Sequence, residues 1–265
     1  MKYYVSWSGG KDSTATIILA HLHKIPIDGI VFSEVMFDKS RGISGELPEH
    51  IDFVKNKAIP IFEEWGFTTK IVRSEKDYLD LFNQVVAKSK IPERNGKKRG
   101  FLIGGMCIAN DRLKLAPIKQ FYRKFDLAGV EYGQYIGIAV DEIQRLKRLK
   151  ASNKVSLLQE FSFTEKMAYD ICKEYDLLSP TYNFSKRGGC WFCPNQGYVE
   201  FAYIKSKYPE LWKELRRLDK EENVVSHGFK YGKTFSEVDA RVDEILSRQN
   251  LFDLMGEKDE TTCSM

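Results

Sequence analysis

The chain has 265 residues with 41 Lys and Arg against 37 Asp and Glu, and its net charge of +4 does not by itself indicate nucleic-acid binding. A composition with 43% hydrophobic and 13% aromatic residues is that of a folded protein with a sizeable core, which excludes disorder and collagen-like repeats. No stretch approaches the ~20 apolar residues of a membrane span, and the N-terminus lacks the layout of a signal peptide. The sequence therefore predicts a cytoplasmic protein without a membrane partner.

Strands and helices alternate in the first half of the chain. Residues 2–7 predict a buried strand, residues 14–23 a helix, and residues 27–36 a second strand. The pattern then predicts a helix over 48–65, a strand over 68–72, a helix near 77–88, an exposed loop over 91–105, a helix over 108–125 and a strand over 135–140. This alternation is typical of a parallel sheet with helices on both faces.

From about residue 152 the predicted strands stop. Helices are predicted over residues 164–175, 197–206, 209–222 and 234–249. We therefore expect a nucleotide-binding α/β domain with a Rossmann-like parallel sheet over residues 1–150. A helical region over residues 151–255 is expected to pack on it and to carry a Cys-x-x-Cys loop, and the polar residues 256–265 are expected to form a flexible tail.

The most specific motif is SGGKDS at residues 8–13, between the first predicted strand and helix. Two glycines allow a tight turn that presents backbone N–H groups to an anion, and serines and a lysine add donors at the positive end of the helix. The spacing differs from the GxxxxGK[ST] and GxGxxG loops. The motif predicts a pyrophosphate site, and the alternative is an ordinary capped turn. The candidate binding residues are Ser8, Gly9, Gly10, Lys11, Asp12 and Ser13.

The motif resembles the PP-loop of the adenine nucleotide alpha hydrolase-like superfamily. Later segments resemble the phosphoadenosine phosphosulfate (PAPS) reductase family within it, in the bacterial and phage branch related to the DNA phosphorothioation sulfurtransferase subunit. These segments are ELPEHIDFV (46–54), CIANDRLKLAP (107–117), GIAVDEIQR (137–145), LLSP (177–180) and RGGCWFCPN (187–195). The resemblance implies a mostly parallel sheet of about five strands, with an adenine nucleotide bound at the C-terminal edge of the strands.

Several charged residues suit a reaction on a nucleotide. Asp12 is a candidate ligand of Mg²⁺ on the phosphates, because hard cations favour carboxylate oxygens. Lys11, Arg145 and Lys114 are candidates to neutralise charge on a leaving pyrophosphate. We take Lys11, Asp12 and Arg145 as candidate catalytic residues and Glu142 as a candidate binding residue. Glu142 and Arg145 also have the spacing of an ordinary i, i+3 helix pair.

The chain has five cysteines and no export signal, which favours metal or redox chemistry over a disulfide framework. Cys190-x-x-Cys193 supplies two thiolates from one tight loop, and Cys107 is the natural third ligand. A closed Zn²⁺ site or a cubane cluster needs four ligands. Cys172 is either the fourth ligand or a small core residue. A [4Fe–4S] cluster, with four cysteines or with one open iron, is favoured over Zn²⁺; a thioredoxin-like pair would need a βαβ setting that this region lacks.

Cys263 lies in the polar tail. PAPS reductases carry their nucleophilic cysteine near the C-terminus in a Glu-Cys-Gly-Leu-His context, but this tail lacks the Gly, Leu and His. Cys263 is therefore either a nucleophile or an incidental thiol.

The favoured function is that of a PP-loop enzyme that cleaves ATP to AMP and pyrophosphate and adenylates an acceptor for sulfur transfer, with a cysteine-ligated Fe–S cluster. One alternative is a PAPS or adenylylsulfate reductase that releases sulfite with a tail thiol. Another is a non-catalytic nucleotide-sensing subunit of a phage or defence system. The expected partners are an adenine nucleotide and a sulfur acceptor, for which nucleic acid is one candidate, and the sequence leaves a homodimer open.

Overall fold

The structure is a computed structural model that describes residues 1–103, 107–149, 152–185 and 189–248. Its residues group into two compact units. The first holds Met1–Tyr78, Ile108–Tyr182 and Gly189, and the second holds the described residues of Leu79–Cys107, Asn183–Lys186 and Cys190–Met265. This division differs from a boundary near residue 150, because residues 79–107 group with the C-terminal helices and α8 (Glu165–Glu174) belongs to the first unit.

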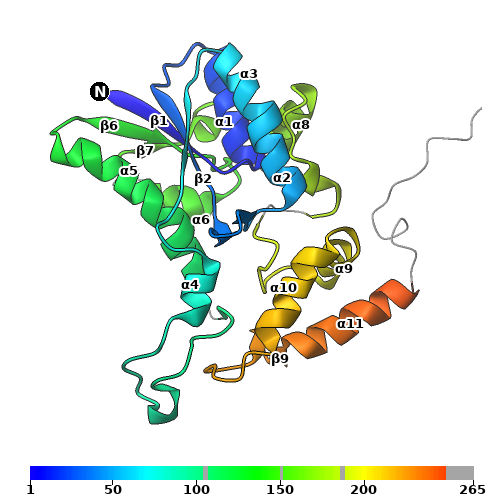
Figure 1. Cartoon of the computed structure of the whole chain (residues 1–265). Helices are drawn as coiled ribbons and strands as arrows, with labels where there is room; N and C mark the ends of the chain where they lie inside the picture. The colour runs from blue at the N-terminus through cyan, green and yellow to red at the C-terminus, as the bar shows by residue number, and fades with distance from the viewer. Residues whose placement is uncertain (104–106, 150–151, 186–188, 249–265) are drawn as a thin grey trace, which may run out of the picture. The chain divides into compact units, whose positions relative to one another are not determined.

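The first unit is built on a parallel sheet of five strands, which confirms the predicted α/β fold class (Figure 1). The strands lie in the order β5-β2-β1-β6-β7, and their pairings are all parallel. Their bounds are Lys2–Trp7 for β1, Gly29–Ser33 for β2, Thr69–Val72 for β5, Tyr132–Tyr135 for β6 and Lys154–Val155 for β7.

Two predictions about strands were wrong. The strand expected over residues 135–140 meets β6 only at Tyr135, because the run that looked strand-like is the loop that leaves the sheet. Strands also do not stop at residue 152. β7 was missed because it is only two residues long, and the second unit contains a hairpin of β8 (Gly228–Lys230) and β9 (Lys233–Thr234).

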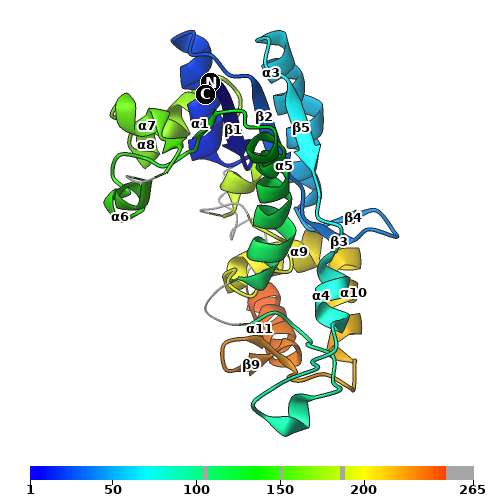
Figure 2. The same cartoon turned by 90° about the vertical axis from the view of Figure 1, so that its left-hand side faces the viewer.

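Helices cover both faces of the sheet, as predicted (Figure 1 and Figure 2). On β1, Val5 and Trp7 face one core with α1 (Lys11–Leu22), α3 (Ile59–Glu64), α7 (Leu157–Glu160) and α8. Tyr4, directly before Val5 in the sequence, faces the other core with α5 (Ala116–Leu127). The two-residue period of the strand thus assigns alternate side chains to the two helical layers.

Shorter elements complete the first unit. A two-stranded sheet of β3 (Met36–Asp38) and β4 (Ile43–Ser44) follows β2. The helix predicted over residues 48–65 is continuous from α2 (Pro48–Asp52) through a π-helical stretch, Phe53–Ala58, into α3. A second π-helical stretch, Asn110–Leu115, precedes α5, and α6 (Ile143–Leu146) follows β6.

The second unit is mainly helical. It contains most of α4 (Tyr78–Asn83), together with α9 (Tyr198–Lys207), α10 (Pro209–Asp219) and α11 (Phe235–Arg248), which confirms the three C-terminal helices. Its core is aromatic: the ring of Phe229 lies 5.0 Å from Phe101 and 5.2 Å from Phe235. Phe201 and Trp212 are buried in the same unit, with their ring centroids 5.8 Å apart.

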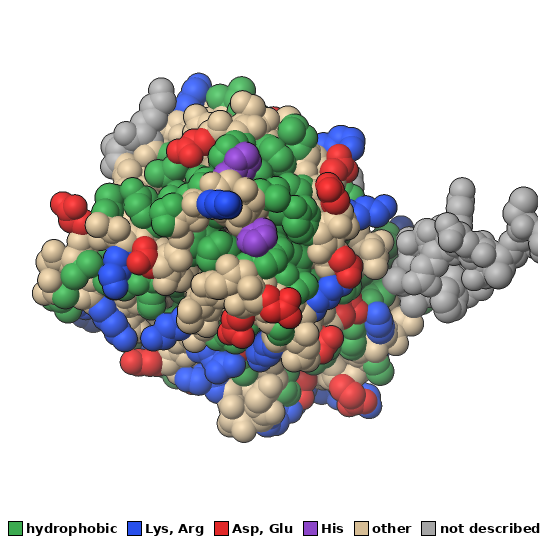
Figure 3. Space-filling view, turned by 90° about the horizontal axis from the view of Figure 1, so that it is seen from above, with side chains coloured by type: hydrophobic (Ala, Val, Ile, Leu, Met, Phe, Trp, Pro, Cys, Tyr) green, Lys and Arg blue, Asp and Glu red, His purple; other side chains and the backbone are tan. Residues whose placement is uncertain are grey.

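One surface at the C-terminal end of α1 is apolar and carries histidines. Figure 3 shows hydrophobic side chains gathered around histidines in the view from above. In the first unit, His21 stacks on Trp65 at 4.2 Å and His23 on Phe161 at 4.1 Å. These rings pack against aromatic neighbours and do not form a set of metal ligands among the described residues. The described helices include none long and apolar enough to cross a membrane.

Asp38 at the end of β3 gives the fold an acid-sensitive contact. Its carboxylate accepts hydrogen bonds from Ser40 Oγ at 2.6 Å and from Arg41 Nε at 2.6 Å. Burial raises the pKa of Asp38, but these hydrogen bonds outweigh it and lower the pKa from 3.8 to about 2. The folded-state pKa lies below the unfolded value, so this contribution to stability is full above about pH 4 and is lost as the pH falls toward 2.

We therefore predict that Asp38→Asn lowers the melting temperature at pH 7 and that the difference from the wild type shrinks between about pH 4 and pH 2. Circular dichroism melts across this range measure it. Asp170→Asn, which removes an exposed ion pair with Lys166, is the control and should have little effect at either pH. A difference for Asp38→Asn that is constant with pH would contradict the prediction.

Candidate functional site

The SGGKDS loop lies between β1 and α1, as predicted. Gly9 has φ +74°, and a Cβ there would lie 2.5 Å from Cε1 of the His50 ring, so the position requires glycine. The hydroxyls of Ser8 and Ser13 lie 3.1 Å apart, and the backbone N–H of Ser8 donates to Ser13 Oγ at 3.2 Å. The serines therefore brace the loop as well as offering donors.

The position of the loop in the sheet is that of a ligand site. β1 lies between β2 and β6, and the chain runs in opposite lateral directions from these central strands. In open α/β sheets, ligands bind in the crevice beyond the carboxyl ends of the strands at such a switch point. Gly137, in the loop after β6, approaches α1 so closely that a Cβ on it would lie 2.4 Å from Ser13 N. This contact aligns the two loops.

A cavity of about 210 Å³ opens at this point. This is below the roughly 300–1,000 Å³ of a typical small-molecule pocket, so its size fits phosphate groups better than a whole nucleotide. Lys114 and Arg145 supply the positive charge of its wall. The lining residues are Ser8, Gly10, Asp12, Ser13, Glu46, His50, Lys114, Gly137, Arg145, Tyr182 and Gly189.

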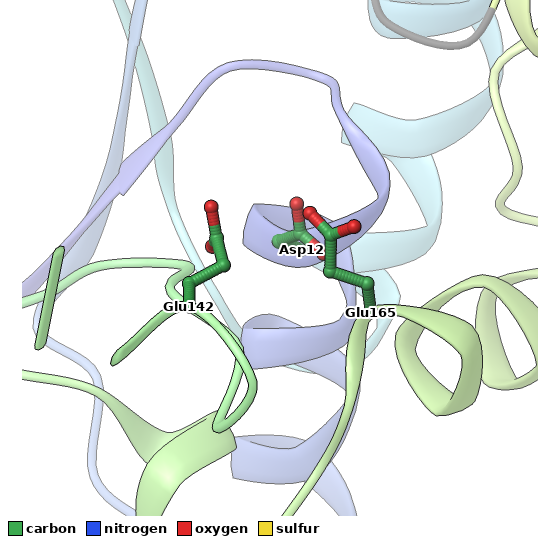
Figure 4. Close-up of side chains that lie close together, drawn as sticks. All are labelled: Asp12, Glu142 and Glu165. Carbon is green, nitrogen blue, oxygen red and sulfur yellow. The ribbon is translucent and has the colours of Figure 1, made fainter. Parts of the chain in front are cut away.

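Three carboxylates lie together beside the loop (Figure 4). Asp12, Glu142 and Glu165 each place a carboxylate oxygen within 4.8 Å of the other two, and no other such group of His, Cys, Asp or Glu ligands occurs in the described part of the chain. Lys11 Nζ lies 2.8 Å from Asp12 and 3.5 Å from Glu165, and Arg145 pairs with Glu142. Glu165, at the start of α8, was missed because it is far from the loop in sequence.

This arrangement gives Lys11 a role that differs from the one expected. Its ammonium binds carboxylates and does not line the cavity, whereas Arg145 does both. Burial raises the pKa of Asp12, and the hydrogen bond and charge of Lys11 oppose that shift only in part. Lys11 therefore lowers the electrostatic cost of three neighbouring carboxylates.

His50 is a site residue that sequence reasoning left out. It lies in α2, is buried, and lines the cavity next to Gly9. Its Nδ1 lies 2.8 Å from Ser179 Oγ, and a hydrogen bond links its ring to the backbone of Ser8. Burial lowers the pKa of His50, which favours the neutral ring. The signal in the sequence that could have identified His50 is its place in a predicted helix that follows the carboxyl end of a central strand.

Glu46 and Lys114 form a second charged pair at the cavity. Glu46 is 4% exposed, and its Oε1 has no hydrogen-bond partner, although Lys114 Nζ lies 3.7 Å away. Buried polar atoms are normally hydrogen-bonded. The pair therefore leaves a buried acceptor at the cavity wall. The sequence had marked Lys114 as a candidate cation, and the structure places it in the wall.

Tyr182 belongs with the phosphate loop. It lies in the first unit, and its hydroxyl accepts a hydrogen bond from the backbone N–H of Lys11 at 2.9 Å. Ser179 and Thr181, just before it, hydrogen-bond to each other at 3.0 Å, and Ser179 also holds His50. Residues 179–182 thus contact the loop directly through Tyr182 and indirectly through His50.

Cys107, Cys190 and Cys193 all belong to the second unit, although Cys107 is distant in sequence. The N–H of Cys193 donates to the carbonyl of Cys190 at 3.0 Å, which closes a tight turn, and Gln196 Nε2 donates to the same carbonyl at 2.7 Å. Between the cysteines, Trp191 and Phe192 are buried. The turn is therefore anchored by its aromatic residues and leaves both cysteines partly accessible.

Lys230 supports the segment that follows the cysteine turn. Its Nζ donates to the carbonyls of Pro194 at 2.8 Å and Gln196 at 2.6 Å. Burial lowers the pKa of Lys230, while the charges of Cys193 and Glu200 oppose that shift. The cation thus lies within electrostatic reach of Cys193.

The donor atoms of the cysteines bear on the kind of metal centre. A tetrahedral Zn²⁺ with Zn–S bonds of about 2.3 Å holds its sulfurs about 3.8 Å apart. The three cysteines do not form a group of ligand atoms within 4.8 Å among the described residues. Cysteine thiolates are ligands of both Zn²⁺ and Fe–S clusters, so the donor set of Cys107, Cys190 and Cys193 fits either kind of metal centre.

Cys172 lies in α8, in the core of the first unit. It is fully buried, and its Sγ donates to the carbonyl of Lys11 at 3.2 Å. Burial raises the pKa of its thiol to about 12. These contacts favour its interpretation as a small core residue, and we leave it out of the ligand set proposed below. Cys263, the tail 256–265, Arg187 and Gly188 lie outside the described residues.

Comparisons with known proteins give limited similarity. No family model matches the sequence. The chain is 28% identical over 233 residues to the uncharacterized protein MJ0973 of Methanocaldococcus jannaschii. The aligned region covers 84% of this chain and 50% of that protein. The chain thus spans about half the length of this curated relative.

Among solved structures, the chain is similar to the U34-tRNA thiolase NcsA from Methanococcus maripaludis with its [4Fe-4S] cluster. The TM-score is 0.40 and the identity 16%, over 94% of this chain and 73% of that chain.

The contact of Gly137 with α1 predicts that Gly137→Ala weakens pyrophosphate binding by about tenfold or more, the scale of a lost hydrogen bond to a charged group. The added Cβ meets backbone atoms of Asp12 and Ser13, so the first turn of α1 must shift. Calorimetric titration with inorganic pyrophosphate and Mg²⁺ measures the affinity.

Gly133→Ala, in β6 just before that loop, is the matched control. Its Cβ meets the ring of Tyr3, away from the cavity, so it should lower stability without weakening the binding of pyrophosphate. Equal loss of affinity in both variants would show that the Gly137 contact has no specific role.

Proposed function

We propose that this chain is a PP-loop enzyme of the adenine nucleotide alpha hydrolase-like superfamily. In this proposal it cleaves ATP between the α- and β-phosphates and transfers AMP to an acceptor oxygen, which sulfur then replaces. The observation that carries the proposal is the cavity at the switch point of the sheet, where the glycine loop and the first turn of α1 meet Lys114 and Arg145. Helix N-termini and such cations bind phosphate.

The proposed reaction has two steps. An oxygen of the acceptor attacks the α-phosphorus, the bond from that phosphorus to the bridging oxygen breaks, and pyrophosphate leaves with that oxygen. A sulfide-equivalent donor then attacks the activated carbon, the carbon–oxygen bond breaks, and AMP leaves with the former acceptor oxygen. Arg145 and Lys114 line the cavity where charge builds on pyrophosphate, and Asp12 is the proposed ligand of Mg²⁺.

The carboxylates make the proposed cation site depend on Lys11. Asp12 and Glu165 already contact its ammonium, so a divalent cation would compete with it for the same oxygens. In the proposed cycle, Lys11 therefore contacts the carboxylates before the cation binds. It is released toward the phosphates afterwards. This retains the catalytic role proposed for Lys11 from the sequence.

The proposed cluster ligands are Cys107, Cys190 and Cys193, with one iron open or held by another group. Their presence in one unit and the exposure of Cys107 support this set. When bound, a [4Fe–4S] cluster supplies a place to hold sulfur or to transfer electrons. The protein's own contribution is to fix the turn through the Cys190 carbonyl and to place the Lys230 cation near Cys193.

The ATP-cleaving activity predicts release of AMP and pyrophosphate from labelled ATP with Mg²⁺. The assay is run alone and with total RNA and sulfide as candidate acceptor and donor. Arg145→Ala should lower the rate about 100-fold, the scale for loss of one group that stabilises developing charge. Lys166→Ala, at an exposed ion pair, is the control and should keep the wild-type rate.

Two results would contradict this proposal. Sulfite release from PAPS without pyrophosphate release from ATP would identify a reductase. Tight ATP binding without turnover under all of these conditions would identify a nucleotide sensor.

The cluster predicts that protein purified without oxygen is brown, with absorbance near about 400 nm. Cys107→Ser, Cys190→Ser and Cys193→Ser should each lose iron and this absorbance. Cys172→Ser is the matched control, because its hydroxyl can replace the thiol as donor to Lys11, and it should keep the cluster. A colourless protein that contains zinc, or loss of iron in the Cys172 variant, would overturn the proposed ligand set.

A further inference from the structure

The hydroxyl of Tyr182 lies at the first amide of α1. The N–H of Lys11 donates to it at 2.9 Å, and Tyr182 lines the cavity beside Gly10. The N-cap of α1 is Gly10, which offers no side-chain cap. The first N–H groups of a helix have no partner within the helix and bind a cap, water or an anion. The phenol of Tyr182 therefore meets one of the amides that a phosphate loop presents to its ligand.

The phenol keeps a donor for a ligand. A phenol oxygen that accepts from an amide still has its own proton to donate. The bond from Lys11 is the only hydrogen bond of the Tyr182 hydroxyl within the described part of the chain. Lys114 and Arg145, which also line the cavity, have no acceptor to offer. Asp12 and Glu46 line it as well, but the Tyr182 hydroxyl donates to neither within the described part of the chain, so its proton is left for an anionic oxygen of a ligand.

Neighbouring contacts fix the position of this phenol. Ser179 and Thr181 hydrogen-bond to each other just before Tyr182, and Ser179 Oγ lies 2.8 Å from the buried ring of His50. The ring of Tyr169 contacts that of Tyr182 edge-on at 6.2 Å. Burial raises the pKa of Tyr182, which keeps the proton on its oxygen at neutral pH. The donor is thus held in place before a ligand binds.

We propose that Tyr182 is a phosphate-binding residue, whose oxygen orients the amide of Lys11 and whose O–H donates to a phosphate oxygen of the nucleotide. This rests on the proposed function in one respect, that the cavity receives phosphate groups. It adds a neutral donor from residues 179–182 to the backbone amides and cations of the site. The opposite role, a placeholder that a phosphate must displace, makes the opposite prediction for removal of the hydroxyl.

The test is the affinity of the full-length protein for inorganic pyrophosphate with Mg²⁺, measured by calorimetry for the wild type and for Tyr182→Phe. Loss of the donor should weaken binding about tenfold, the scale of a hydrogen bond to a charged group. Tyr169→Phe removes only the hydroxyl from a ring that touches that of Tyr182 and does not line the cavity. This variant should bind pyrophosphate as tightly as the wild type does. Melting temperatures of both variants show whether they fold.

The outcomes separate the two proposals. If the wild type binds pyrophosphate and Tyr182→Phe binds it equally well or more tightly, the role of Tyr182 is overturned and the phosphate site stands. If the wild type does not bind pyrophosphate, both fail. A second measurement uses wild-type protein containing 3-fluorotyrosine: the ¹⁹F signal missing from Tyr182→Phe should shift when pyrophosphate is added. An unchanged signal at saturating pyrophosphate would overturn direct contact.

Discussion

The close approach of two backbone segments positions the whole candidate site. The loop after β6 meets the first turn of α1 at Gly137, where even a methyl group would overlap backbone atoms. Gly9, on the other side of the same turn, has a positive φ and faces the His50 ring with no room for a side chain. These contacts confine the first turn of α1, where Gly10, Asp12 and Ser13 line the cavity.

The charged residues of the site form two layers: the cations that line the cavity, and the carboxylates that pair with cations, which we call the carboxylate layer. Lys114 and Arg145 reach the cavity, and each also has a carboxylate partner, Glu46 or Glu142. Lys11 contacts only the carboxylate layer. A phosphate that enters the cavity therefore meets cations already oriented by acidic neighbours, which reduces the reorganisation that binding would otherwise require. The acidic neighbours also limit the net positive charge, and this leaves a role for a divalent cation in the proposed binding of ATP.

The sequence predicted the parts of the fold and site that depend on local pattern. Short apolar runs identified β1 and β2, and the glycine loop was found because its residues are consecutive. β7 escaped because two residues carry no period, and residues 136–140 looked like a strand because apolar residues also line a loop that packs on α1. Glu165, His50 and Tyr182 were missed for a different reason: each reaches the loop from a distant segment, which only tertiary packing brings near.

The same distinction explains the cysteines. Spacing alone predicted the Cys190 and Cys193 pair, and it ranked Cys107 as the third ligand, but it could not separate a ligand from a core residue at Cys172. Packing favours the interpretation of Cys172 as a core residue: it lies against α1 with its thiol donating a hydrogen bond to the carbonyl of Lys11, whereas Cys107, Cys190 and Cys193 belong to the second unit.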